Sequence, residues 1–375
     1  MRRNFHCYLI YRLFMAFEAS KKEWSELYSF LRLLSDGHVC AGTPSGEVCV
    51  ERPWKVVVVQ REEHDGTRRY LIDSENVRIV GEKMDKVVPR TCFASAADLI
   101  LEALKQAQSD EVTSPDGVEE FLDDIAIYDL EAKTEDRTDY HIGFWDMQAP
   151  LVGFRVFSKL SPMIPLLDGG RAANLKFEQT GVKFASPTVN KVNQLETPNE
   201  VLDRMRLIER LGGTLKYSDV ADKVFRSNLC MIDLHFPRML AEMLRTMYYE
   251  DTTRVSELTA RIEDINPLKI KDELIRKHGF YRYKMKQFLL ALALGMRPAK
   301  LFNGTDSAVE GFIFVDGDGR LKCYHKADRE TFADFLFSNT RFLKGALEKD
   351  KYGYLERENG AYYFKLNAKI GFVKR

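Results

Sequence analysis

The order of strand-like and helix-like segments constrains the fold of this chain more than any other feature. Residues 20–37, SKKEWSELYSFLRLLSDG, carry apolar side chains at the i, i+3, i+4 and i+7 spacing of an amphipathic helix. Ser20 and Glu23 form a capping-box pattern at its start, and Gly37 is typical of a helix end. The same patterns predict a buried strand and then a second helix, at residues 54–62 and 94–108.

Two more strands and a change of pattern follow. The runs TDYHIGFWDM and VGFRVFSK predict strands at residues 139–146 and 152–160. Residues 185–200 are polar and contain proline, which is typical of a linker. Helical spacing then dominates to about residue 300, and strands return in the C-terminal part. The alternation predicts a mixed α/β (α+β) fold. The predicted domains are residues 1–185 and residues 186–375, the second helical and then β-rich.

Charge and cysteine usage narrow the class of protein. The chain has 375 residues with 56 basic and 56 acidic side chains, so it is no globally basic nucleic-acid binder, although it can carry a local basic face. The six cysteines include no C-x-x-C pair, which argues against a zinc or redox motif. So few cysteines in so long a chain favour a reducing, intracellular compartment, and we expect a cytoplasmic protein. No apolar run approaches the ~18 residues of a membrane span.

The N-terminal run CYLIYRLFMAF, residues 7–17, follows two arginines and faintly imitates a signal peptide. The run is short, is broken by Arg12 and lacks an A-x-A cleavage site. We therefore expect no secretion signal, and Met15 is an alternative start of the protein.

The two strand-like runs at 139–146 and 152–160 predict an antiparallel hairpin. If the connection is 147–151, Asp146 pairs with Val152 and Asp139 pairs with Lys159. Directly opposite residues share a face of the sheet, with Cβ atoms about 5 Å apart. A tighter loop would pair Asp139 with Phe157 instead, but it would place a proline inside the ladder, where the missing N–H is unfavourable. We therefore favour the register in which Lys159 meets Asp139.

An aspartate beside a lysine suits the hydrolysis of a phosphodiester. Carboxylates hold a divalent metal, which activates water and neutralises charge in the transition state, and a nearby lysine helps to orient or deprotonate that water. Because Mg²⁺ prefers one or two carboxylates plus waters, Asp139 alone is only part of such a site. An ordinary surface salt bridge between two strands would give the same short pattern.

A basic and aromatic segment is the candidate DNA contact. Residues 276–287, RKHGFYRYKMKQ, contain no acidic side chain and interleave aromatic with basic residues. Basic side chains neutralise phosphates, so the segment suits a surface that follows a nucleic-acid backbone. The start of a solvated helix would show the same pattern. The predicted phosphate contacts are Arg276, Lys277, Arg282, Lys284 and Lys286.

Two other features carry no chemistry. The run DGDG at 316–319 lacks the remaining ligands of a calcium loop and predicts a hairpin turn. His141, His235 and His325 are isolated, and each is interpreted as a packed or surface residue.

Longer stretches match a known family. The chain resembles the HpaII-type restriction endonucleases nearly end to end, and the similar stretches follow in family order. The opening helix KKEWSELYSFLRLLSDG is similar to that of the family, and GFRVFSKLSPMIPLLDGGRAANLKFE is similar to its catalytic strand and the segment after it. The remaining similar stretches are NLCMIDLHFPRMLAEML, NPL, FYRYKMKQFLLALALGMRP, FNGTDSAVEGFIFVDGDGRLKCYH, FADFLFSNT and LNAKIGF.

The resemblance implies a type II restriction enzyme with a PD-(D/E)xK nuclease core. Such an enzyme uses Mg²⁺ to cut both strands of double-stranded DNA at a short palindrome, here a CCGG-like site. A companion DNA methyltransferase would protect the host. Cutting a palindrome is easiest with two-fold symmetry, so we expect a homodimer, at least on DNA. Asp139 matches the aspartate at the start of the family's first catalytic strand.

The catalytic strand departs from the family pattern. In the family run GFSIKS, the lysine falls at Phe157 and the serine that replaces the acid falls at Arg155. Lys159 lies on the same face of the strand, about 6–7 Å further along, which a lysine side chain can span. We therefore expect Lys159 to be the catalytic lysine, with Lys176 and Lys183 as other possible substitutes. The competing hypothesis is a DNA-binding relative that has lost catalysis.

The sequence does not decide which residue is the second metal-binding acid. Glu26 on the first helix and Glu178 are the two candidates beside Asp139, and Glu23 is a weaker one because the capping box already uses it. Glu26 lies away from the centre of the apolar stripe, so it could face either solvent or a site. An unrelated phosphoesterase or an interaction protein is a third hypothesis, which the near-complete resemblance disfavours.

Overall fold

The computed structural model describes residues 17–132, 134–147, 151–304 and 308–373. Most of the run at 7–17, with Met15, lies outside the described residues, and so does Pro150. The chain divides into two compact units. Unit 1 comprises Met1–Met163 and Ala308–Asp328, and unit 2 comprises Ile164–Ser307 and Arg329–Arg375. Among the helices of the described residues, none is long and apolar enough to cross a membrane.

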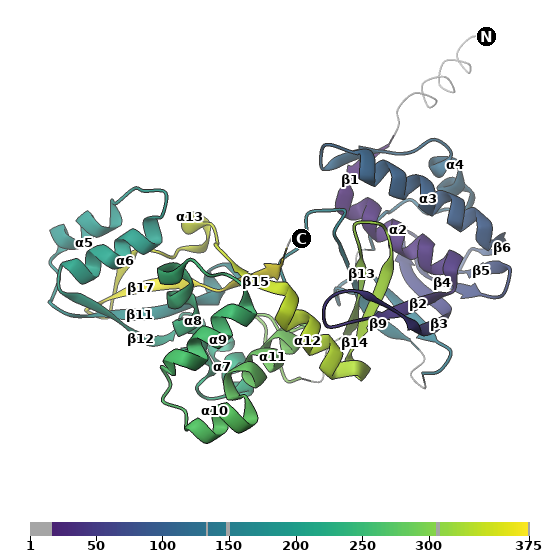
Figure 1. Cartoon of the computed structure of the whole chain (residues 1–375). Coiled ribbons are helices and arrows are strands. Elements are labelled where there is room, and N and C mark those ends of the chain that lie inside the picture. Colours follow the sequence, from purple (N-terminus) through teal and green to yellow (C-terminus); the bar gives the residue numbers. More distant parts are fainter. Residues whose placement is uncertain (1–16, 133, 148–150, 305–307, 374–375) are drawn as a thin grey trace, which may run out of the picture. The chain divides into compact units, whose positions relative to one another are not determined.

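The described part of unit 1 forms a nine-stranded mixed sheet, in the order β2-β14-β13-β9-β8-β3-β4-β5-β6 (Figure 1). The strands are β2 (His38–Gly42), β3 (Val48–Glu63), β4 (Gly66–Ile72), β5 (Asn76–Val80), β6 (Asp85–Pro89), β8 (Tyr140–Phe144), β9 (Val152–Ser158), β13 (Val309–Val315) and β14 (Leu321–His325). β9 pairs with β13 in parallel, and β14 pairs with β2 in parallel. β2 also pairs with the first half of the long β3, which closes one part of the sheet into a ring.

Two helices cover one face of this sheet. Figure 1 shows α2 (Lys21–Asp36) and α3 (Arg90–Gln106) side by side, and α2 contacts β9, β13 and β2. The predicted capping box of α2 is confirmed, because the Ser20 side chain and that of Glu23 each accept from the other's backbone N–H. Gly37 ends the helix in the left-handed conformation, at φ 62°. Trp24 and Phe30 of α2 are buried in the core beneath.

The smaller elements of unit 1 lie beside these helices. The short strands β1 (Glu18–Ser20) and β7 (Glu111–Thr113) pair with each other, and α4 (Val118–Asp124) packs against α3. The 3-10 turn η2 (Lys326–Asp328) ends the segment that returns to unit 1. The predicted DGDG turn is confirmed, because the Asp316 backbone N–H donates to the Arg320 carbonyl at 2.9 Å and joins β13 to β14.

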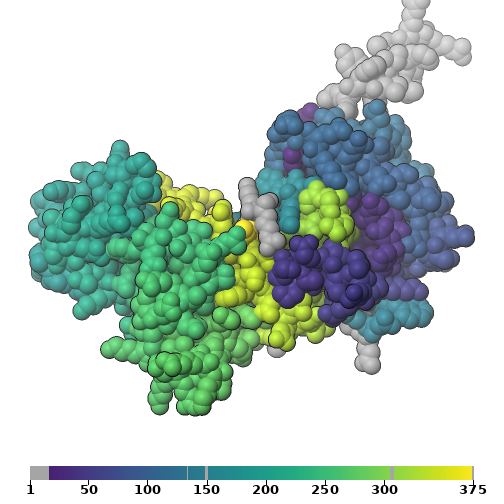
Figure 2. Space-filling model, viewed as in Figure 1, coloured from purple at the N-terminus to yellow at the C-terminus, as the bar shows by residue number. Residues whose placement is uncertain are grey.

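The segment Ala308–Asp328 changes the predicted division of the chain. Its strands β13 and β14 join the sheet of unit 1, although they follow β9 by about 150 residues. Figure 2 shows its yellow-green surface between the purple and blue surfaces of N-terminal residues. The first unit ends at Met163 rather than at 185, because the chain leaves the sheet soon after β9. Local patterns predicted these strands, but not their return to the first sheet.

Unit 2 combines two antiparallel sheets with helices. The sheets have the orders β12-β11-β17-β16 and β10-β18-β15. Their strands are β10 (Leu167–Asp168), β11 (Asn174–Gly181), β12 (Gly213–Val220), β15 (Thr340–Leu343), β16 (Leu355–Glu358), β17 (Ala361–Asn367) and β18 (Lys369–Phe372). The helices are η1 (Gly170–Ala173), α5 (Ser186–Asn193), α6 (Glu200–Arg210), α7 (Lys223–Ile232), α8 (Phe236–Glu250), α9 (Val255–Ile265), α10 (Asp272–His278), α11 (Phe280–Ala293), α12 (Arg329–Asn339) and α13 (Leu347–Asp350).

The predicted linker at 185–200 is wrong, because residues Ser186–Asn193 form helix α5 within unit 2. The proline that suggested a linker lies in the first turn of α5, where a missing N–H costs nothing. Val189 and Val192 are buried and hold this helix against the unit. The mixed α/β class that the alternation predicted is confirmed.

Candidate active site

Asp139 lies immediately before β8, at the edge of the strand pair that the sequence singled out. Its backbone N–H donates to the Phe154 carbonyl at 2.8 Å, and its Oδ2 accepts from the Val156 backbone N–H at 2.6 Å. Burial raises the pKa of Asp139 to about 6, although the hydrogen bond from Val156 favours the charged form. The carboxylate is therefore fixed on β9 in an environment that disfavours its charge.

The hairpin register differs from both predicted registers, which are wrong. Tyr140 pairs with Phe154 and Ile142 with Val152, so the position opposite Asp139 is that of Arg155. The other edge of β8 pairs with β3: Phe144 pairs with Val56, and the next residue, Trp145, donates its backbone N–H to the Lys55 carbonyl. The pairing with β9 ends at Ile142, so the connection between the two strands is longer than either predicted loop.

Lys159 therefore does not face Asp139 across the hairpin. It lies four residues beyond Arg155, about 13 Å along an extended strand. Its Nζ is 2.7 Å from Oδ1 of Asp316, and its backbone N–H donates to the Val315 carbonyl at 2.9 Å. The geometry that suggested a catalytic Lys159 is absent, and its role stays a prediction that mutation can test.

Phe157 takes a structural role where the family pattern has a lysine. Its side chain is buried, and its ring centroid lies 4.5 Å from that of Phe312 on the neighbouring strand β13. The guanidinium of Arg155 lies 5.1 Å from the Phe157 ring centroid. The aromatic side chain belongs to the core of the unit, and the cation nearest to Asp139 on this strand is Arg155.

Glu26 is the second carboxylate of the cluster. It is buried on the face of α2 that meets the sheet, and its Oε1 accepts from the Ala132 backbone N–H at 2.8 Å. Burial raises its pKa well above the usual range, and the nearby charge of Asp139 raises it further. The sequence left open whether Glu26 faces solvent or a site, and the structure places it beside Asp139.

The other predicted acids and lysines have different surroundings. Glu23 is occupied by the capping box of α2. Glu178 lies on β11 in unit 2, opposite Lys216 on one side and Tyr363 on the other. Lys176 on the same strand forms an ion pair with Glu358. Lys183 is exposed just beyond β11. Asp139 and Glu26 thus share unit 1, whereas Glu178 and both substitute lysines belong to unit 2.

Lys22 and Glu131 join the cluster and were missed from the sequence. The Lys22 Nζ lies 2.5 Å from Oε2 of Glu131. Burial by itself would lower the pKa of Lys22, but the hydrogen bond with Glu131 raises it above its ordinary value. The charges of Glu26 and Asp139 act in the same direction. The available signal was helical spacing, because Lys22 precedes Glu26 by four residues and so lies on the same face of α2.

The carboxyl pair fits a divalent cation. Asp139 and Glu26 are both buried, and the charge of Asp139 raises the pKa of Glu26, which is the kind of strain that a cation relieves. Magnesium is commonly bound by one or two carboxylates together with waters and oxygens of the substrate phosphate. Asp139 and Glu26 could supply the two carboxylates. Among the described residues, no three His, Cys, Asp or Glu side chains are close enough to form a complete metal cluster. Protein groups would therefore furnish part of the coordination.

The predicted DNA-contact residues lie on α10 and α11 of unit 2. Most of them have acidic neighbours: Arg276 with Asp272, Lys277 with Glu273, Lys284 with Asp233 and Lys286 with Asp334. These acids lie outside the segment 276–287. The absence of acidic residues within the segment therefore did not show that its basic side chains are unpaired. Arg282 and its neighbour Tyr283 are exposed. Arg282 is therefore the predicted contact for which the described residues provide no ion pair.

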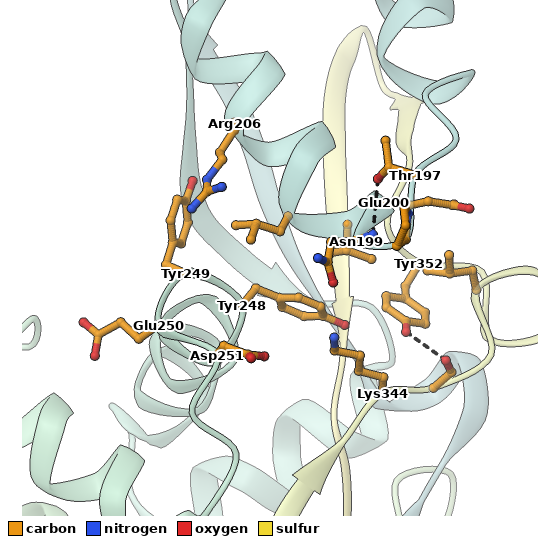
Figure 3. Close-up of a pocket in the computed structure, with 15 residues that line it drawn as sticks. Thr197, Asn199, Glu200, Arg206, Tyr248, Tyr249, Glu250, Asp251, Lys344 and Tyr352 are labelled. Carbon is orange, nitrogen blue, oxygen red and sulfur yellow. Dashed lines mark hydrogen bonds between the residues drawn. The ribbon is translucent and has the colours of Figure 1, made fainter.

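Unit 2 also contains a cavity of about 420 Å³, shown in Figure 3. The rings of Tyr248 and Tyr352 and the side chain of Lys344 lie together in it, and Tyr352 donates to the Gly345 carbonyl at 2.9 Å. Its wall includes the start of α6, at Asn199. None of the predicted site residues lines this cavity.

Comparison with known proteins identifies the family. The family model for the HpaII restriction endonuclease matches residues 20–372. The type II restriction enzyme HpaII of Haemophilus parainfluenzae is 29% identical over 363 residues, which cover 95% of this chain and 99% of that enzyme. No solved structure matches the chain. The match over nearly the whole length shows that this chain belongs to the HpaII restriction endonuclease family.

Proposed function

We propose that this protein is an active, Mg²⁺-dependent endonuclease that cuts a CCGG-like palindrome with a PD-(D/E)xK-type site at Asp139 and Glu26. Membership of the family makes the protein a type II site-specific deoxyribonuclease, whose substrate is DNA. The metal, the target sequence and the site residues are the proposal. The observation that carries it is the pair of buried carboxyls, one from α2 and one at the start of β8.

Asp139 and Glu26 would hold the metal, which when bound supplies an activated water and neutralises charge on the phosphate. Val156 and Ala132 hold the two carboxyls in place through backbone N–H groups, so their geometry exists before DNA binds. Glu178 stays a prediction as a further metal ligand.

DNA recognition would use unit 2 as well. The basic residues of α10 and α11 are proposed to contact phosphates, with the exposed Arg282 as the principal one. A homodimer would place two such sites on the two strands of a palindrome. A companion methyltransferase would protect the host DNA by modifying the same sequence.

One observation favours a second candidate function, a DNA-binding relative without catalysis. The family lysine is replaced by the buried Phe157, and Lys159 is paired with Asp316. If no other cation assists the carboxyl pair, the protein would bind its site without cutting it.

Cleavage of plasmid DNA separates these functions. Purified protein is incubated with unmethylated plasmid and Mg²⁺, with EDTA as the control. We expect discrete fragments that EDTA abolishes, with ends at CCGG-like sites. The Asp139→Asn variant should lose about 100-fold or more in rate. Asp146→Asn, which changes an exposed aspartate just beyond β8, should cut like the wild type. Specific binding without cuts at any metal concentration would instead support the second candidate.

A further inference from the structure

We propose that Lys22, on helix α2, is the catalytic cation of this site and takes the place of the lysine that the family carries on the catalytic strand. The inference rests on the proposed function and adds a residue to the same site. It assigns the missing charge to a different element of the fold, the helix that also carries Glu26.

The strand itself does not supply a lysine near Asp139. Arg155 occupies the position opposite Asp139, and Phe157 is packed against Phe312. Lys159 lies about 13 Å beyond Arg155 by the rise of an extended strand, which is further than its side chain reaches. Its ammonium is held by Asp316.

Lys22 lies on the same helix as Glu26 and on the same side of it. It lies one helical turn before Glu26, and residues at this spacing have Cβ atoms about 5–6 Å apart. Its positive charge acts on both carboxyls of the pair, Glu26 and Asp139. Its ion pair with Glu131 restrains the position of the ammonium group. The side chain is 43% exposed, so a DNA phosphate can approach it.

In this position the ammonium would donate a hydrogen bond to the scissile phosphate. It would stabilise the negative charge that builds up while the bond from water oxygen to phosphorus forms and the bond to the leaving oxygen breaks. Lys22 gains and loses no proton in this role. The proton of the attacking water passes to solvent, and the leaving oxygen keeps the electron pair of the broken bond and takes a proton from solvent. Glu131 would release or share the ammonium when the phosphate arrives.

The test compares two neighbouring lysines. Lys22→Met removes the proposed charge, whereas Lys21→Met removes a lysine whose Nζ donates to the Ala107 carbonyl at 2.8 Å, away from the carboxyl pair. We expect Lys22→Met to cut plasmid about 100-fold more slowly or worse. Lys21→Met should stay within about twofold of the wild type. Lys22→Arg, which keeps the charge, should restore at least part of the rate if Lys22→Met loses it.

A second measurement does not depend on cleavage. Ca²⁺ is titrated against the melting temperature of the DNA-free protein. Because Lys22 repels a cation bound by Glu26 and Asp139, we expect Lys22→Met to bind Ca²⁺ about fivefold more tightly. Lys21→Met should not change the Ca²⁺ midpoint. A lysine that only braces α2 through Glu131 would leave this midpoint unchanged.

Lys159→Met serves as the rival variant. Loss of cutting in Lys159→Met with normal cutting in Lys22→Met would overturn the Lys22 inference and leave the proposed function standing. Normal cutting in Lys22→Met together with an unchanged Ca²⁺ midpoint would also overturn it. A wild-type protein that binds its site and never cuts would reject the proposed function itself.

Discussion

At the residue scale, the site is defined by two carboxyls whose charges are unfavourable in the folded protein. Burial raises the pKa of both Asp139 and Glu26, and the charge of Asp139 raises the pKa of Glu26 further. Bringing two acids together in a core is unfavourable, because each buried charge costs folding free energy. The pair is thus the kind of destabilising arrangement that a binding site for a cation requires.

This arrangement predicts a pH dependence of stability in metal-free protein. The pKa of Asp139 is about 6 in the folded state, against an ordinary value of 3.8. The folded protein therefore keeps a proton that the unfolded chain has lost, and its stability falls as pH rises from about 4 to 6. Asp139→Asn should remove this loss and raise the free energy of unfolding at pH 8 by about 3 kcal/mol. Urea unfolding in EDTA measures it, and a variant that is less stable at pH 8 would contradict it.

At the scale of elements, β9 is the strand on which the site depends. It pairs with β8 on one edge and in parallel with β13 on the other, and its backbone holds Asp139. β13 can approach β9 closely because residue 153 of β9 is a glycine. A Cβ built on Gly153 would lie 2.2 Å from the Ala308 carbonyl oxygen and 2.5 Å from the Thr138 side chain. Neither the backbone at Ala308 nor the packed strand β9 can move without a cost in folding free energy.

Gly153→Ala should therefore weaken the join between β9 and β13. We expect a loss of about 1–3 kcal/mol in the free energy of unfolding, as for other overpacked sites. Gly317→Ala is the matched control in the same unit, because a Cβ there would meet no atom within 4 Å. Chemical denaturation of both variants measures the difference. Equal stability of the two would show that β13 approaches β9 less closely than described.

At the scale of the whole molecule, a net charge of zero hides an uneven use of basic residues. Many of the arginines and lysines of the described residues are paired with acids, among them four of the five predicted DNA contacts. Such paired residues can bind a phosphate only by giving up their acidic partners, which reduces the free energy gained on binding DNA. An exposed arginine beside an exposed tyrosine, as at Arg282 and Tyr283, suits direct contact with a phosphate.

Arg282→Ala should weaken DNA binding at every sequence to a similar degree and reduce the salt dependence of binding by about one phosphate contact. Fluorescence anisotropy with a labelled duplex in Ca²⁺, across a series of salt concentrations, measures both effects. Arg226→Ala is the control, because this arginine of α7 is also exposed but is paired with Asp219. An Arg282→Ala variant with unchanged affinity and salt slope would remove α11 from the DNA contact.

Much of the fold could be predicted from the sequence because it depends on local patterns. The helix α2 with its capping box, the helix α3, the mainly helical stretch before residue 300 and the β13–β14 turn at DGDG all occur where the patterns placed them. A linker at 185–200 could not be distinguished from a short helix by sequence, because proline occurs both in linkers and in the first turn of a helix. The hairpin register was also beyond reach, because the pairing with β9 ends at Ile142 and local patterns do not show where a strand pairing ends.

By itself the sequence determined the family and the mixed α/β class, and it singled out Asp139 and the strand that follows it as candidates. These properties depend on residue order and periodicity, which a single chain displays directly. The tertiary structure decided that Arg155 lies opposite Asp139, that Phe157 belongs to the core, and that Glu26 and Lys22 face the same carboxyl. Glu26 and Lys22 precede Asp139 by more than 110 residues in the chain, and only the packing of α2 on the sheet brings them near it.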